Sequence, residues 1–342
     1  MKEFLRKKNI IFSAKRYGID ALGAMAQGLF ASLLIGTIIS TLGEQLGIGI
    51  LVTVGGYAKG ATGAAMAISI GVALQCPPLV LFSLAAVGMA ANELGGAGGP
   101  LAVLVVTIFA AEFGKLVSKE TKIDIIVTPF VTICVGVLLS LGCAPAIGAA
   151  ASTVGTAIMW ATELQPFFMG IIVSVLMGMI LTLPISSAAL GIILNLSGIA
   201  AGAATIGCCA QMIGFATASL RENGIGGLLA QGIGTSMLQV PNIVRKPLIW
   251  LPPIITSAIL GPISTVVLKM TNNAIGSGMG TAGFVGPMMT YKTMTTGGTS
   301  AVTVIVMILV MQIIAPAFLT YFISEAMRRA GLIKDGDMKL DI

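Results

Sequence analysis

Residues 125–162 read IIVTPFVTICVGVLLSLGCAPAIGAAASTVGTAIMWAT and contain no charged side chain. After Glu163, a second uncharged run extends over residues 164–220. A helix needs about 20 mostly apolar residues to cross the hydrocarbon core of a bilayer, so both runs are long enough to span it, and the second is long enough to do so two or three times. These two stretches therefore predict an integral membrane protein.

The composition of the whole chain agrees with this prediction. Of its 342 residues, 56% are hydrophobic and only 9% are charged, whereas about a quarter are charged in an ordinary soluble domain. The apolar segments are continuous and do not alternate, which is the pattern of helices and not of a β-barrel. The 44 glycines favour closely packed helices. We predict an all-α polytopic membrane protein with about 8–10 transmembrane helices, some of them re-entrant or broken.

The charged residues gather at the two ends of the chain. Eight lie within residues 1–20 and eight more between Glu325 and Asp341. We therefore predict a basic amphipathic segment over 1–17, a transmembrane domain over 18–325 and a tail over 326–342. Basic residues mark cytoplasmic loops, so both termini are expected in the cytoplasm. The basic segment is either a helix on the membrane surface or a plain cytoplasmic flank.

Several kinds of chemistry lack the residues that they need. The chain has no histidine, which removes a histidine base, a histidine metal ligand and a phosphohistidine. The five cysteines do not have the spacing of a zinc site, and no phosphate-binding P-loop motif occurs. We expect no catalytic residue, no metal or other cofactor and no nucleic-acid partner. The cysteines are Cys76, Cys134, Cys143, Cys208 and Cys209.

The most distinctive stretch is residues 271–300, which contain seven glycines and a single charge, Lys292. The stretch is too polar to face lipid and has too little charge for an exterior loop. We predict irregular backbone at membrane depth that forms part of a solute site. The residues expected to present side chains or backbone amides to the solute are Asn272, Asn273, Gly276, Gly278 and Gly280.

Further candidates lie at other breaks in the apolar pattern. Asn92 and Glu93 precede a glycine-rich run that ends at Pro100. A carboxylate beside such a run either faces a cavity or is an ordinary loop charge. Uncharged amides in apolar surroundings either bind solute or tie helices together. The amides selected as solute-binding candidates are Asn195, Gln211 and Asn242.

Three stretches carry a pattern of Gly, Pro and basic residues: EFGKLVSKETKIDIIVTPFVT (112–132), MGMILTLPISSAA (177–189) and GTSMLQVPNIVRKPLIWLPPIITSAILGP (234–262). In these stretches the chain resembles the membrane component (IIC) of sugar phosphotransferase systems, in the fructose-like branch. Over most of its length it also resembles the stand-alone IIC-like group that includes PfoR-type regulators. Where the family carries a glutamate in the third stretch, this chain has Met237 or Leu238.

The resemblance implies a multi-pass permease in the plasma membrane that carries a small polar, sugar-like solute. It also implies a homodimer and a separate IIB-type protein or cytoplasmic regulator as partner, with the lipid bilayer around it. Without histidine or a fused IIA or IIB domain, the chain is not expected to be an enzyme by itself. The alternative is a membrane sensor that kept the IIC-like fold and lost transport.

Overall fold

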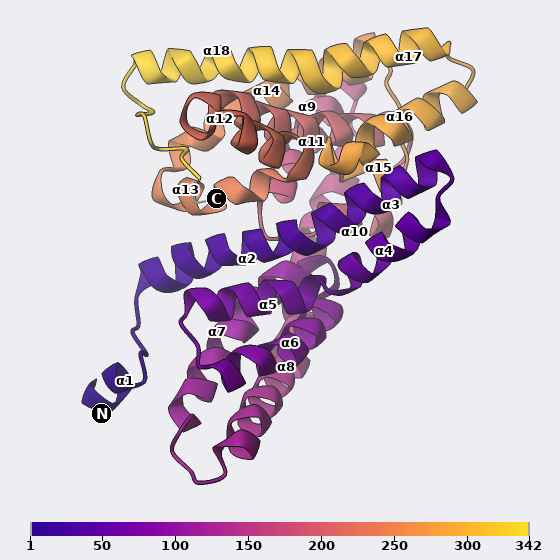
Figure 1. Ribbon diagram of the computed structural model, residues 1–342. Helices are drawn as coiled ribbons and strands as arrows, with labels where there is room; N and C mark the ends of the chain where they lie inside the picture. The colour runs from indigo at the N-terminus through magenta and orange to yellow at the C-terminus, as the bar shows by residue number, and fades with distance from the viewer. Residues whose placement is uncertain (1, 341–342) are drawn as a thin grey trace. The chain divides into compact units, whose positions relative to one another are not determined.

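The computed structural model describes residues 2–340, which form helices and turns without any β-strand (Figure 1). Six helical stretches in this part of the chain are long and apolar enough to cross a membrane, and two shorter helices are also apolar. The prediction of an all-α polytopic membrane protein is therefore confirmed. The long stretches are Arg16–Leu46, Pro78–Val117, Asp124–Thr162, Gly198–Ala218, Pro247–Val267 and Ala301–Arg329, and the shorter helices are Thr62–Ala73 and Pro166–Thr182.

The chain forms two compact units, Met1–Ala151 and Ser152–Ile342. The boundary falls inside one long helix, α8 (Asp124–Thr162). The predicted transmembrane domain over 18–325 therefore contains parts of both units. Each unit is described by itself below.

The first unit is built from helices that turn back on one another. Glycines allow the close approach: a Cβ atom built at Gly88 would lie 2.2 Å from the carbonyl oxygen of Gly63. Pro78 and Pro100 stand in the first turns of α6 and α7, where the missing amide hydrogen is not needed. The helices are α1 (Lys2–Lys7), α2 (Ala21–Leu29), α3 (Ile35–Leu46), α4 (Gly49–Gly60), α5 (Thr62–Ala73), α6 (Pro78–Gly95), α7 (Gly99–Val117) and the first part of α8.

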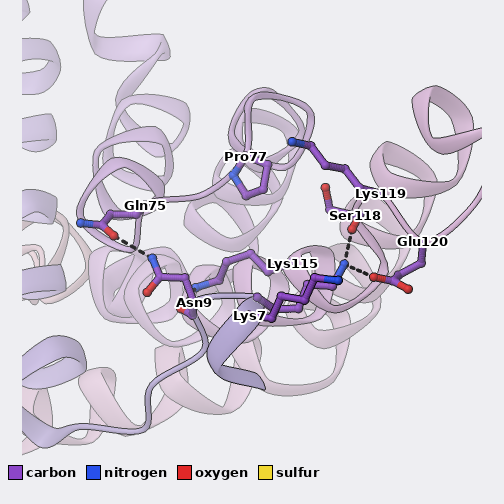
Figure 2. Close-up of a pocket in the computed structure, with 9 residues that line it drawn as sticks. Lys7, Asn9, Gln75, Pro77, Lys115, Ser118, Lys119 and Glu120 are labelled. Atoms are coloured by element: carbon purple, nitrogen blue, oxygen red, sulfur yellow. Dashed lines mark hydrogen bonds and ion pairs between the residues drawn. The ribbon is translucent and has the colours of Figure 1, made fainter. Parts of the chain in front are cut away.

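At one end of this unit, the start of the chain meets the turns after α5 and α7 around a hollow of about 430 Å³ (Figure 2). The buried ammonium of Lys115 lies 2.7 Å from Glu112 Oε2 and donates to the carbonyl oxygen of Asn9 at 3.1 Å. Lys8 pairs with Glu120. The basic N-terminal segment is thus held against the unit by ion pairs and hydrogen bonds.

The second unit is arranged around α11 (Gly198–Ala218), most of which is buried. Its surface is lined with Gly, Ala and Cys, so neighbouring helices come very close; a Cβ atom at Gly207 would lie 1.8 Å from the carbonyl oxygen of Ser174. Helices α9, α14 and α18 pack directly on α11. The other helices of this unit are α9 (Pro166–Thr182), α10 (Ser187–Ile193), α12 (Leu220–Leu229), α13 (Val240–Arg245), α14 (Leu251–Pro262), α15 (Ala274–Ser277), α16 (Val285–Thr296), α17 (Ala301–Ile308) and α18 (Ala315–Arg329).

Candidate functional site

A first broken segment, residues 220–245, leaves the C-terminal end of α11 and returns to it. Asn223 near its start donates to the carbonyl oxygen of Met338, and Asn242 near its end donates to that of Lys339, both at 2.9 Å. Between these ends the chain forms two short turns, η4 (Ala230–Gly234) and η5 (Ser236–Gln239). The segment is therefore a hairpin whose tip lies alongside α11.

A second broken segment, residues 268–296, starts at the opposite end of α11. The backbone N–H of Asn272 donates to the carbonyl oxygen of Gly198, the first residue of that helix, at 3.2 Å. At its tip, Thr281 Oγ1 donates to the carbonyl oxygen of Gly232 at 2.5 Å, and the turn η8 (Ala282–Phe284) lies against η4. The tips of the two segments thus meet beside the middle of α11. Broken helices that meet in this way commonly form the solute sites of transporters.

The prediction of irregular backbone over 271–300 is correct for only part of the segment. Residues 268–284 contain a bridge, the single turn of α15, the short turn η8 and residues with positive φ. From Val285 to Thr296, however, the chain is the regular helix α16. Glycine is absent between Pro287 and Thr296, and a proline in the first turn of a helix favours its start. The prediction is therefore wrong for α16.

Gln211 lies at the level where the two tips meet, and its side chain is fully buried. Its Oε1 accepts a hydrogen bond from Trp250 Nε1 at 2.9 Å and another from Thr182 Oγ1 at 3.2 Å. An indole N–H can only donate, so Oε1 must face Trp250 and the amide nitrogen must point elsewhere. That nitrogen, Nε2, has no hydrogen-bond acceptor among the described residues.

Two hydroxyl groups complete the cluster around Gln211. Thr182 Oγ1, at the end of α9, lies 2.8 Å from Ser236 Oγ, at the tip of the first hairpin. The site thus gathers uncharged donors and acceptors from α9, α11, η5 and the turn that contains Trp250. Hydroxyls both donate and accept, so the cluster suits a solute that carries hydroxyl groups.

Sequence reasoning selected Gln211 as a site residue but did not select Thr182, Ser236 or Trp250. A signal for them was present, because all three lie inside the stretches 177–189 and 234–262 that carry the family resemblance. It also missed Gln312, a buried amide whose Nε2 donates to Thr290 and whose Oε1 has no partner in the described chain.

Asn272 is also fully buried, but its amide groups all have partners, in the second segment and on α11. Its Nδ2 donates to Thr205 Oγ1 at 2.8 Å and to Thr290 Oγ1 at 3.0 Å, and its Oδ1 accepts from the amide of Asn273 at 2.8 Å. Asn273 caps α15 by accepting from the amide of Gly276 at 2.9 Å. Both side chains hold the turn in shape, and a direct role in solute binding stays a prediction.

The three glycines selected from this segment allow close contacts with neighbouring protein. A Cβ atom at Gly278 would lie 2.1 Å from the carbonyl oxygen of Ser187, and one at Gly276 would lie 2.5 Å from Asn272 Oδ1. Gly280 packs on the backbone of Cys208 and has φ +51°. Residues other than glycine rarely adopt this backbone conformation. The proposed role of the three glycines in presenting amides to a solute stays a prediction.

Asn195 and Asn242 lie at other positions of the second unit. Asn195 is exposed and has φ +46° just after α10, a left-handed conformation that asparagine tolerates at helix ends. Asn242 donates to Gln239 Oε1 at 2.9 Å as well as to the tail. The contacts of Asn242 and the left-handed backbone of Asn195 thus account for these two residues structurally, and a direct role in solute binding stays a prediction.

Asn92 and Glu93 belong to the first unit, whereas the other candidates lie in the second. Asn92, on α6, is half-buried, and its Oδ1 lies 2.7 Å from the position of a Cβ atom at Gly99, the first residue of α7. Glu93 is exposed at the end of α6. The predicted residues are therefore distributed over the two units.

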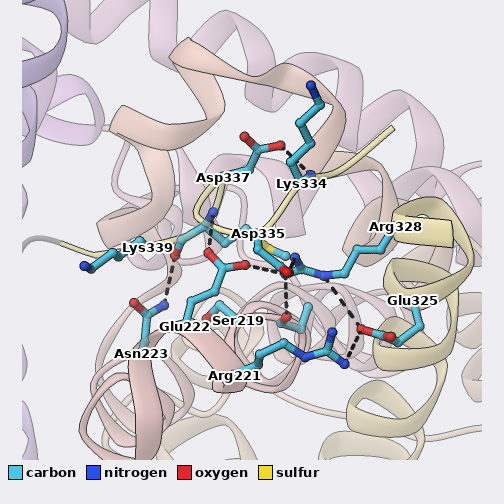
Figure 3. A network of polar contacts seen from close by, with 12 residues as sticks. Ser219, Arg221, Glu222, Asn223, Glu325, Arg328, Lys334, Asp335, Asp337 and Lys339 are labelled. Atoms are coloured by element: carbon cyan, nitrogen blue, oxygen red, sulfur yellow. Dashed lines mark hydrogen bonds and ion pairs between the residues drawn. The ribbon is translucent and has the colours of Figure 1, made fainter. Parts of the chain in front are cut away.

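The chain after α18 docks on the first hairpin through a polar network (Figure 3). The buried guanidinium of Arg328 contacts Glu222 and Asp335, and the other carboxylate oxygen of Glu222 accepts from the amide of Met338 at 2.9 Å. Gln239 Nε2 donates to Gln231 Oε1 and to the carbonyl oxygen of Met338, both at 2.9 Å. The described part of the predicted tail is thus packed against the second unit.

The cysteines are free thiols in apolar or mixed surroundings. Burial raises the pKa of Cys76, in the turn after α5, to about 11, so its reactive thiolate form is scarce at neutral pH. Within residues 2–340, no three His, Cys, Asp or Glu side chains lie close enough to hold a metal ion.

Comparison with known families identifies the chain. The family described as phosphotransferase system EIIC matches residues 19–340. The chain therefore belongs to this family of membrane permease components. No curated protein and no solved structure matches the chain.

Proposed function

From this family membership, we propose that the protein is the permease subunit of a sugar phosphotransferase system and carries a small polar, sugar-like solute. We place the solute where the two broken segments meet beside Gln211. The observation that carries this proposal is the buried Nε2 of Gln211, which has no protein acceptor while Trp250 fixes the opposite oxygen.

An unpaired buried amide donor costs about 1–3 kcal/mol, so the site gains free energy when a ligand supplies an acceptor. A sugar hydroxyl is such an acceptor. The hydroxyls of Thr182 and Ser236 would accept hydrogen bonds from, or donate them to, the neighbouring hydroxyl groups of the same sugar. Trp250, which is half-buried and packs against the cluster of Phe215 and Ile249, would offer the exposed part of its ring to the C–H groups of a sugar ring. The cluster therefore matches both the polar and the apolar surface of a carbohydrate.

The apolar residues Met237 and Leu238 follow Ser236 directly and are buried. The resemblance to the fructose-like branch implies a glutamate at this place. We propose that this protein recognises its solute with amides and hydroxyls in place of that carboxylate. This difference favours a neutral solute over a cationic one.

Orientation and partners are part of the proposal. At the C-terminal end of α11 the basic residues Arg221, Lys246 and Arg328 share one polar network with the tail, and basic residues favour the cytoplasmic side. We therefore place this end and both termini in the cytoplasm. A IIB-type protein would supply the phosphoryl group there, and the permease would work as a homodimer.

The experiment compares Gln211→Leu with the wild type in a panel of monosaccharides, disaccharides and polyols. Ligand-induced shifts in the unfolding temperature report binding, and proteoliposomes report uptake. We expect a sugar that binds the wild type to bind the variant at least about tenfold more weakly, because a buried hydrogen bond to the ligand is lost.

Gln165→Leu is the matched control, because Gln165 is an exposed glutamine at the start of α9. It should bind the sugar like the wild type. Equal affinity in the wild type and Gln211→Leu would contradict the proposed site. Binding without uptake, even with a IIB-type protein present, would favour the alternative of a sensor that has lost transport.

A further inference from the structure

The hollow of the first unit is lined by three separate stretches of chain (Figure 2). These are the end of α1 with the residues after it, the turn between α5 and α6, and the end of α7 with the turn that follows it. Four lysines and one glutamate contribute to the lining, so positive charge exceeds negative charge by three. The charged lining residues are Lys7, Lys8, Lys115, Lys119 and Glu120.

Two of these lysines are paired with protein groups and two are not. Lys115 and Lys8 contact Glu112 and Glu120, respectively. The ammonium groups of Lys7 and Lys119 have no ion-pair or hydrogen-bond partner within residues 2–340, and both side chains are exposed. The hollow therefore holds two cations that are available to a ligand.

Three residues around the hollow have left-handed backbone. Asn9, Gln75 and Lys119, each just after a helix, have φ values of 54°, 54° and 61°, which residues other than glycine and asparagine rarely adopt. These three residues are half of the six non-glycine residues with positive φ in the described chain. Such residues cluster at functional sites when surrounding contacts hold them in place. Here the side-chain amide of Asn9 donates to Gln75 Oε1 at 2.7 Å, and the backbone N–H of Lys119 donates to Asp124 Oδ1 at 2.7 Å.

We propose that this hollow binds the phosphate group of an anionic ligand. Its excess of positive charge selects an anion, and lysine ammonium groups bind phosphate oxygens as point charges. Basic pockets at the ends of transmembrane helices can take the head group of an anionic lipid. Phe4 and Phe12, three residues before and five residues after Lys7, are 41% and 77% exposed and would suit neighbouring acyl chains. A soluble phosphate compound would offer the same anionic group.

The test removes the two unpaired charges in the double variant Lys7→Gln/Lys119→Gln. Lys15→Gln/Lys122→Gln is the matched control, because both of these lysines are exposed and lie outside the lining. In the first arm, native mass spectrometry counts phosphatidylglycerol adducts from an equimolar mixture with phosphatidylcholine. In the second arm, inorganic phosphate is titrated in phosphatidylcholine nanodiscs at constant ionic strength, and the unfolding temperature is recorded.

We expect the wild type and the control to prefer phosphatidylglycerol in the first arm or to be stabilised by phosphate in the second. The pocket variant should bind the same anionic ligand about tenfold more weakly. If the pocket variant loses only the preference for phosphatidylglycerol, the ligand is a lipid head group. If it also loses the stabilisation by phosphate, the site is open to soluble phosphate. If the pocket variant matches the control in both arms, the proposal is overturned.

Discussion

Gln211 and Asn272 are both fully buried amides of the second unit, and both were predicted from the sequence to bind solute. Their surroundings differ. The Nδ2 of Asn272 donates to the hydroxyls of Thr205 and Thr290, and its Oδ1 accepts from the backbone N–H of Asn273. Gln211 uses only its oxygen, and its nitrogen has no acceptor in the described chain. We propose that the buried amide whose groups are all used holds the fold, whereas the incomplete one is available to a ligand.

The difference follows from where each amide lies. Asn272 stands inside a segment that folds back on itself, so Gly286 and Thr290 of the same segment are close by. Gln211 stands on a straight helix and depends on other elements for its contacts. Helix α9 can come close because Gly178 has no Cβ atom. A Cβ atom built there would lie only 2.6 Å from the carbonyl oxygen of Gly207. Thr182 is then near enough to donate to Gln211.

The largest expected effect on stability is that of Asn272→Ala. The substitution leaves the hydroxyls of Thr205 and Thr290 without this partner and opens space beside Gly276. We expect a loss of about 3 kcal/mol in the free energy of unfolding, since several buried polar groups lose a partner at once. Thermal unfolding of the purified protein measures it. An unchanged midpoint would show that the network around Asn272 does not hold the segment.

An intermediate effect is expected for Gln239→Leu in the network that binds the tail. The variant removes the bonds from Gln239 to Gln231 and to Met338, whereas Asn242 keeps Lys339 as an acceptor. We expect a loss of about 2 kcal/mol and faster proteolysis after α18. Gln165→Leu serves as the exposed control. Equal protease resistance in both variants would mean that the tail is held by its apolar contacts alone.

The smallest effect on stability is expected for Gln211→Leu. The variant loses the bonds from Trp250 and Thr182, but it also removes a buried donor that has no partner, and these two changes oppose each other. We expect the free energy of unfolding to change by less than about 1 kcal/mol. A loss as large as that of Asn272→Ala would place Gln211 among the structural amides and remove the contrast between them.

The class of fold was predictable because it depends on composition. Long runs without charge, such as residues 125–162, require a membrane or a large buried core, and the rest of the chain has too little polar surface for the latter. The glycine-rich stretch after Thr271 also marked a break in helix at the correct place. Its helical second half is not evident from the sequence, because Gly286 and Pro287 fit a loop as well as the first turn of a helix.

The site was only partly predictable because hydrogen-bond partners depend on contacts between distant segments. The sequence indicates that Gln211 is a polar residue in an apolar helix, but not whether a neighbour uses both of its groups. The same applies to the tail. Its charges suggested a solvated end, whereas Ile333 and Met338 are 2% and 0% exposed and pack with Phe215 and Ile249.

The most direct test of the proposed site is a structure of the protein with a sugar that binds it, at a resolution that shows side chains. The proposal predicts a sugar oxygen within about 3 Å of Gln211 Nε2, the normal distance of such a hydrogen bond, between the tips of residues 220–245 and 268–296. A sugar bound elsewhere, with Gln211 Nε2 donating to a protein oxygen, would contradict it.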